Sequence, residues 1–235
     1  MSPRFVSRLA AVLALCIACN EDLGPVSGPP AALVLVAGDG QSGPVGSPLG
    51  QPIRARVLDA AGAPVWLATV QFSPEGASGS TSPIVAVADE HGEATTTWTL
   101  GHLVGTHRLR ATVLDGPSDA MVVLSATGVA GPAARMFRVV GASQTGFPNE
   151  TLPTPLLARV ADVFGNGVPG VVVRYRILRG GGSLSAPEGV TDSQGIASVL
   201  WTLGPDVTGT PDSVAAEVDG VQGSPLYYIA VVLPP

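Results

Sequence analysis

The amino-acid sequence predicts an all-β protein made of two antiparallel β-sandwiches in tandem. Three observations support this fold class. Apolar and polar residues alternate with a period of two in several segments, and the same blocks of sequence occur twice. Gly and Pro, 30 and 22 of the 235 residues, interrupt the apolar runs every eight to twelve residues or so. Beyond the N-terminal segment, no stretch shows a helical period.

The repeat divides the chain into two copies. Residues 55–62 match residues 158–165, and the block Trp98-Thr99-Leu100-Gly101 matches Trp201-Thr202-Leu203-Gly204, both at an offset of 103. Two separate blocks at one offset are not expected by chance. A copy of about 100 residues can bury about two-thirds of the surface that its unfolded chain exposes. The predicted domains are residues 31–128 and 133–234.

Each copy contains strands with one apolar face and one polar face. The predicted inward positions are Ile53, Ala55, Val57, Ala94, Thr96, Trp98 and Leu100 in the first copy, and Ala197, Val199, Trp201 and Leu203 in the second. This alternation is typical of an antiparallel strand with one face in the core and the other in water. We therefore expect Trp98 and Trp201 to be core residues.

Four Asp-x-x-Gly segments lie between the predicted strands. They begin at Asp59, Asp89, Asp162 and Asp192. An Asp at the first position of a turn accepts bonds from backbone N–H groups, and a Gly at the fourth position takes a positive φ without a steric penalty. These segments are therefore predicted to be chain reversals.

The first residues predict export from the cell. Arg4 and Arg8 precede an apolar run over residues 9–18, which is typical of a signal peptide and too short to span the ~30 Å of hydrocarbon in a bilayer. We assign residues 1–18 to this signal. The only two cysteines, Cys16 and Cys19, lie at its end, so no disulfide framework is predicted.

The segment Cys16-Ile17-Ala18-Cys19 resembles the lipobox of bacterial lipoproteins, with Cys16 where Leu is usual. This resemblance implies that Cys19 becomes the lipidated first residue of the mature chain, which would attach the protein to a membrane. Cleavage by ordinary signal peptidase near the same place is the alternative. Residues 19–30 contain no apolar period and are expected to form a flexible tether.

The second copy resembles the bacterial immunoglobulin-like (Ig-like) repeat of the invasin and intimin type. The residues that carry the resemblance are Val160-Ala161-Asp162, Gly165 to Val171, Tyr175, Thr191 to Ala197 and Trp201 to Gly204. The first copy has Trp66 and Leu67 where the second has Pro169 and Gly170. The resemblance implies two tandem immunoglobulin-like sandwiches. In that family such modules are rigid rods that build adhesins and surface stalks.

Composition argues against several other functions. All twelve basic residues are Arg, so a Walker A loop and a Lys Schiff base are excluded. The net charge of −6 argues against a nucleic-acid partner. Residues 38–43 match G-x-G-x-x-G, but Pro44 and Pro48 follow where a nucleotide site needs a helix, so we expect a loop and no nucleotide. No enzyme activity and no organic cofactor are predicted.

The acids that recur in both copies are the candidates for a calcium site. They are Asp59, Asp89, Asp115, Asp162, Asp192 and Asp219. Calcium needs six to eight oxygen ligands or so, which would require several loops to converge; isolated turn aspartates explain the same residues. His91, His102 and His107 occur in the first copy only, at spacings that fit no common zinc pattern, and are expected in solvated loops.

These observations predict a non-catalytic lipoprotein of a bacterial cell envelope, periplasmic or surface-facing, whose modules act as a spacer or an adhesion stalk. Its partners would be the membrane, through the lipid anchor, and a protein or glycan at the cell surface. Trp66 has no aromatic counterpart in the second copy and is the candidate contact residue. The alternatives are a polysaccharide- or ligand-binding module and an accessory subunit of an envelope complex.

Overall fold

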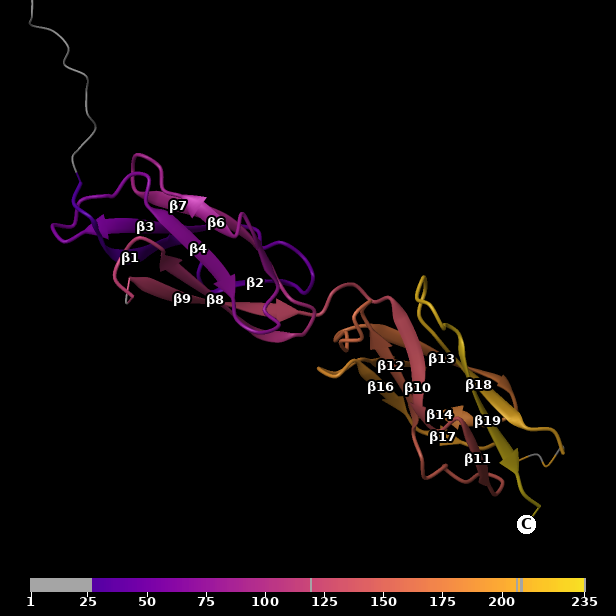
Figure 1. Ribbon diagram of the computed structural model, residues 1–235. Coiled ribbons are helices and arrows are strands. Elements are labelled where there is room, and N and C mark those ends of the chain that lie inside the picture. Colours follow the sequence, from indigo (N-terminus) through magenta and orange to yellow (C-terminus); the bar gives the residue numbers. More distant parts are fainter. Residues whose placement is uncertain (1–26, 119, 206, 208, 235) are drawn as a thin grey trace, which may run out of the picture.

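The computed structural model describes residues 27–118, 120–205, 207 and 209–234. Within these ranges every regular element is a β-strand, so the predicted all-β fold is confirmed. The strands form two sandwiches that follow one another end to end (Figure 1). In this part of the chain there is also no helix long and apolar enough to cross a membrane.

The first sandwich packs a sheet of order β1-β3-β7-β5 against a sheet of order β2-β9-β8-β4-β6. Its strands are β1 (Pro30–Ala37), β2 (Gln41–Pro44), β3 (Ile53–Asp59), β4 (Thr69–Pro74), β5 (Ser80–Ser82), β6 (Val85–Val87), β7 (Glu93–Thr99), β8 (Gly105–Val113) and β9 (Met121–Val129). The chain changes sheets after β1, because β1 runs antiparallel to β3 whereas β2 runs parallel to β9.

The second sandwich repeats this topology. Its strands are β10 (Arg135–Val140), β11 (Ser143–Gly146), β12 (Leu156–Ala161), β13 (Val172–Arg179), β14 (Ser183–Leu184), β15 (Glu188–Val190), β16 (Ile196–Val199), β17 (Trp201–Thr202), β18 (Asp212–Glu217) and β19 (Leu226–Val232). One layer contains β10-β12-β16 and the pair β14-β17, and the other has the order β11-β19-β18-β13-β15. As in the first sandwich, the chain changes sheets after its first strand, and β11 runs parallel to β19.

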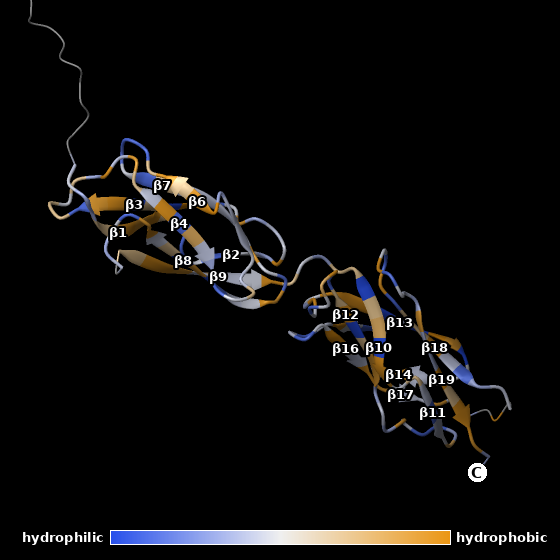
Figure 2. Cartoon of the chain, viewed as in Figure 1, coloured by the Kyte–Doolittle hydropathy of each residue, from blue (hydrophilic) through white to orange (hydrophobic). Residues whose placement is uncertain are grey.

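Each sandwich has its own hydrophobic core. The first cluster of buried residues lies between Leu33 and Ala126, and the second lies between Met136 and Val232. Trp98 and Trp201 are the largest fully buried side chains and occupy matched positions in the two cores, as the alternation predicts. In Figure 2 much of the hydrophobic colour runs along the strands of both sandwiches.

The four Asp-x-x-Gly segments are turns of one kind. In each, an Asp carboxylate oxygen accepts hydrogen bonds from the backbone N–H groups two and four residues further on. The acceptors are Asp59, Asp89, Asp162 and Asp192. The glycine of every turn has a positive φ, for example 92° at Gly165. These bonds fix the chain reversals that follow β3 and β12 and that precede β7 and β16.

The first sandwich begins within the predicted tether. The backbone N–H of Gly28 donates a 2.9 Å hydrogen bond to Oδ2 of Asp59, and β1 starts at Pro30. The last residues of the segment 19–30 are therefore attached to the sandwich. The predicted signal peptide, residues 1–18, and Cys19 lie outside the described residues.

Candidate functional site

Loops from both sandwiches meet at the joint between β9 and β10. The second sandwich contributes residues 162–167, which connect β12 to β13 and which we call the docking loop. The first sandwich contributes Gly46, His102 and Val104, which we call the receiving surface. Gly46 follows β2, and the other two residues lie between β7 and β8.

An aromatic stack forms the centre of the joint. The rings of His102 and Phe164 lie with their centroids 4.1 Å apart and their planes 9° from parallel. Gly46, at a φ of 71°, makes room for this stack, because a Cβ there would lie 2.6 Å from Cε2 and Cζ of Phe164. A larger residue at position 46 would therefore occupy the space that the Phe164 ring fills.

Asn166 connects the two sandwiches through its side-chain amide. Its Nδ2 donates to the backbone oxygen of His102 at 2.8 Å and to Oδ2 of Asp162 at 2.9 Å. Its Oδ1 accepts from the backbone N–H of Val104 at 3.4 Å. Asn166 thus contacts the receiving surface with both ends of its amide, while Asp162 fixes its orientation.

Asp162 anchors the docking loop and the connecting peptide. Its side chain is fully buried, and it also accepts a 3.0 Å hydrogen bond from the backbone N–H of Gly131, which lies between the sandwiches. Burial alone would raise the pKa of this carboxyl group. The hydrogen bonds from Asn166, Gly131 and Phe164 outweigh burial and lower the pKa below its usual value. The carboxylate is therefore ionised at neutral pH.

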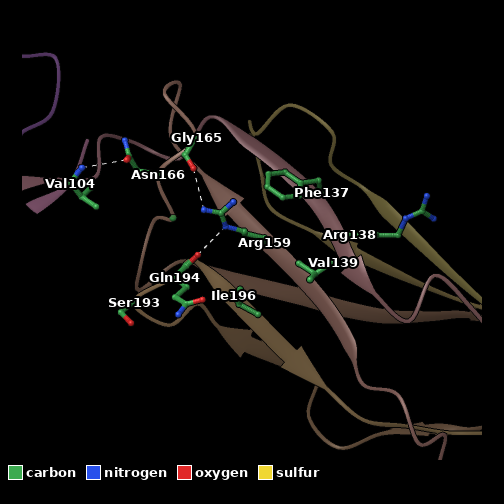
Figure 3. A pocket seen from close by; sticks show the side chains of 11 residues that line it. Val104, Phe137, Arg138, Val139, Arg159, Gly165, Asn166, Ser193, Gln194 and Ile196 are labelled. Carbon is green, nitrogen blue, oxygen red and sulfur yellow. Dashed lines mark hydrogen bonds between the residues drawn. The ribbon is translucent and has the colours of Figure 1, made fainter. Parts of the chain in front are cut away.

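A groove of about 740 Å³ lies beside the joint, between Val104 of the first sandwich and Phe137, Arg159 and Gln194 of the second (Figure 3). The guanidinium carbon of Arg159 lies 5.5 Å from the centroid of the Phe137 ring, within the range of a cation–π contact. Arg159 also donates to the backbone oxygens of Gln194 and Gly165, at 3.1 Å each. Its side chain is thus held against the wall of the groove.

The groove carries no acid–base machinery. None of its lining residues is an acid or a histidine, and Ser193 is the hydroxyl in the lining. In Figure 3, Arg138 points away from Arg159, and it donates to the backbone oxygen of Tyr227.

The structure places the predicted contact residue and the six acids in turns and at strand ends of the two sandwiches. Trp66 is 55% exposed, in the segment between β3 and β4. Asp115 and Asp219 are exposed, and Asp219 forms an ion pair with Arg174 at 3.0 Å. In the described residues, no group of three or more His, Cys, Asp or Glu side chains is placed to hold a metal ion. Calcium binding and the contact role of Trp66 stay predictions.

One expectation about the histidines is wrong. His107 is not in a solvated loop: it lies in β8 with 4% of its surface exposed, and its Nε2 is 2.8 Å from the backbone oxygen of Leu103. The period-two pattern of β8 places it inward. His91 and His102 are exposed, but His102 is also part of the joint.

Sequence reasoning did not identify the residues of the joint. Phe164 and Asn166 follow Asp162 in a turn that both copies share, and the first copy has Ala61 and Ala63 at those places. The sequence did contain a signal for these residues. One turn carries a large aromatic side chain and an amide, whereas the matching turn of the other copy carries two alanines.

No protein-family model and no curated protein sequence matches this chain. Among solved structures, InvD of Yersinia pseudotuberculosis aligns with a TM-score of 0.52 and 17% identity, over 87% of this chain and 57% of InvD. FdeC, an adhesin of Escherichia coli, aligns with a TM-score of 0.50 and 18% identity, over 85% of this chain and 63% of FdeC. The D00-D0 domain of intimin aligns with a TM-score of 0.40 and 16% identity, over 86% of this chain and 99% of that domain.

The alignments with InvD and FdeC confirm the fold. InvD and FdeC share with this chain the Ig-like sandwich fold that the residues of the second copy indicate. This chain spans less than two-thirds of the length of either protein.

Proposed function

We propose that this chain is an exported, non-catalytic protein of the bacterial cell envelope, whose two sandwiches are separate domains that together form a spacer or an adhesion stalk. The observation that carries the proposal is the joint, where a stacked ring pair and the amide of Asn166 hold two complete sandwiches end to end. A joint of this kind connects the two sandwiches into one longer unit, and it does not require a binding pocket.

The arrangement of the chain fits a stalk. The first sandwich begins at the end far from the joint, and the second projects beyond the joint (Figure 1). An attachment before β1 would therefore hold the far end of the second sandwich away from the surface. FdeC, which has this fold, is described as an adhesin. Contact with a protein or a glycan at the cell surface is the corresponding proposal for this chain, with Trp66 as an exposed contact residue.

The attachment that we propose is a lipid on Cys19. Several acyl chains would hold the protein firmly, since each buried methylene contributes about 0.8 kcal/mol. Replacing Cys19 by Ser removes the acylation site, and we expect the protein to move from the membrane fraction to the soluble fraction after export. Ser7→Ala is the control, since it changes a residue of the predicted signal outside the segment 16–19 and should leave the protein with the membrane.

Protease treatment of intact cells, followed by immunoblotting, then tests the stalk itself. Cleavage of the wild-type chain on intact cells supports a surface stalk, and protection until the outer barrier is opened supports a periplasmic spacer. Membrane association that persists in Cys19→Ser would rule out the lipid anchor. Recovery of the wild-type chain in the cytoplasm would overturn the envelope assignment as a whole.

A further inference from the structure

We propose that the joint between the sandwiches works in one direction only. The docking loop of the second sandwich and the receiving surface of the first each occur once in the pair, and the outer ends of the pair carry residues that prevent the same contact. This inference deepens the proposed stalk and rests on the two sandwiches being separate domains, but not on the lipid anchor.

Both sandwiches have the same hydrogen bond at the end where the chain enters them. In the first, the N–H of Gly28 donates to Oδ2 of Asp59 at 2.9 Å, and in the second the N–H of Gly131 donates to Oδ2 of Asp162 at 3.0 Å. Each donor precedes its acceptor by 31 residues. The turn that presents the docking loop is therefore present in both copies.

The side chains on this turn differ between the copies. Phe164 and Asn166 of the second sandwich correspond to Ala61 and Ala63 of the first. An alanine has neither a ring to stack on a histidine nor an amide to bridge two backbone groups. The outer end of the first sandwich thus has the same turn as the docking loop, but it lacks the aromatic ring and the amide that make the contact.

The receiving surface also has a counterpart in the second sandwich, with the same backbone hydrogen bond. The N–H of Gly46 donates to the oxygen of Gly101 at 3.0 Å, and the N–H of Asn149 donates to the oxygen of Gly204 at 3.3 Å. Both turn residues have a positive φ, 71° at Gly46 and 61° at Asn149. The outer end of the second sandwich therefore repeats the backbone of the receiving surface.

At this outer end the space for a ring is filled. Asn149 has a side chain at the place where a Cβ on Gly46 would collide with Phe164. Pro205 stands at the position of His102, so there is no aromatic ring for a stack. A docking loop like that of the second sandwich cannot seat here as it does on the first. The order of the two modules is thus encoded in four positions: 46, 102, 164 and 166.

The repeat supplies the variants that test this inference. Phe164→Ala with Asn166→Ala gives the docking loop the residues of the first copy, and Gly46→Asn gives the receiving surface the residue of the second. Each change imports a residue that the other sandwich already accommodates in the same turn, which protects folding. Val163→Ala is the matched control, because Ala60 is its counterpart and Val163 is 59% exposed beside Phe164.

The measurement is backbone ¹⁵N relaxation by NMR on the full chain, purified with Cys19→Ser so that no lipid is attached. In the reference protein and in Val163→Ala, we expect one rotational correlation time for both sandwiches. In Phe164→Ala/Asn166→Ala and in Gly46→Asn, we expect a shorter rotational correlation time for each sandwich, with the chemical shifts of both cores unchanged.

Three outcomes would overturn the inference. They are separate tumbling in the reference protein, common tumbling that survives both the docking-loop and the Gly46→Asn changes, and loss of common tumbling in Val163→Ala. None of them bears on the lipid anchor, since fractionation of the Cys19→Ser and Ser7→Ala proteins tests that part of the proposed function separately.

Discussion

At the scale of single residues, the buried carboxylate of Asp162 links the fold to the joint. It accepts hydrogen bonds from the N–H groups of Phe164, Asn166 and Gly131 and from the amide of Asn166. Its counterpart Asp59 accepts three hydrogen bonds from backbone N–H groups. These bonds lower the pKa of Asp59 as well, and the bond from Gly28 has the largest effect. The carboxylate oxygens are thus occupied by N–H donors, which supports the interpretation as turn aspartates.

The lowered pKa of Asp162 predicts how the stability of the second sandwich changes with pH. In the unfolded chain this carboxyl has a pKa of about 3.9. Because the folded pKa is lower, the group binds protons more readily when unfolded, and its contribution to stability is present above pH ~4 and is lost as the pH falls through the folded pKa. We expect urea denaturation, followed by NMR signals of the second sandwich, to show a fall in stability between about pH 5 and pH 2.

The variant Asp162→Asn separates this carboxyl from the other acids. An amide has one acceptor oxygen where the carboxylate has two, and each oxygen of Asp162 accepts two hydrogen bonds. Two donors therefore lose their partner, and we expect a loss of about 1–3 kcal/mol at pH 7. The part of the pH dependence that comes from Asp162 should disappear. An equally steep fall in the variant would show that other groups cause it.

At the scale of elements, close crossings of two loops explain the glycine of the repeated Trp-Thr-Leu-Gly block. A Cβ on Gly101 would lie 1.8 Å from the backbone oxygen of Ala77. In the second copy a Cβ on Gly204 would lie 2.7 Å from the backbone N of Gly181. The end of β7, and of β17 in the second copy, therefore passes directly over the loop that leads into β5 or β14.

This crossing predicts a strong effect of Gly101→Ala on the first sandwich. The added methyl group has no room unless backbone moves, and overpacking of this kind costs about 1–3 kcal/mol or more. Gly50→Ala is the control, because a Cβ there meets no atom within 4 Å, and we expect a change within about 0.5 kcal/mol. Thermal unfolding of the two variants compares them, and equal midpoints would contradict the close crossing.

The elements could be predicted from the sequence better than the contacts between them. The period of two fixes which side chains of β3, β7 and β16 face inward, and Asp with Gly fixes the turns, since both depend on local geometry. The joint depends on which loops meet in space. Phe164 and His102 are 62 positions apart and lie in segments without a period, so neither pattern nor turn chemistry pairs them. The burial of His107 could have been predicted from the alternation in β8.

At the scale of the whole molecule, the two cores share no residue among those that the structure describes, and the contacts between the sandwiches described above come from loop residues. The hydrophobic burial that stabilises each sandwich therefore comes from its own strands. The similar lengths and topologies of the copies suggest similar stabilities. The cores should nevertheless respond separately to a change in either one.

Trp98→Ala and Trp201→Ala test this separation as a matched pair. Each removes a fully buried indole from one core, which costs about 3–5 kcal/mol, and Trp98→Ala also leaves the backbone oxygen of Ser78 without its 2.9 Å bond from Nε1. We expect amide hydrogen exchange to accelerate across the first sandwich in Trp98→Ala and across the second in Trp201→Ala, with the other sandwich nearly unchanged. Trp66→Ala, at an exposed position, should alter neither.

The pattern of exchange in these variants also bears on the joint. If docking stabilises the loops that it covers, Trp201→Ala should also speed exchange at Val104 of the first sandwich. The N–H of Val104 donates to the side-chain Oδ1 of Asn166, and this bond breaks when the second sandwich unfolds. The remaining amides of the intact sandwich should keep their protection. Acceleration throughout both sandwiches in either variant would mean that the chain unfolds as one cooperative unit, and the division into two domains would then be wrong.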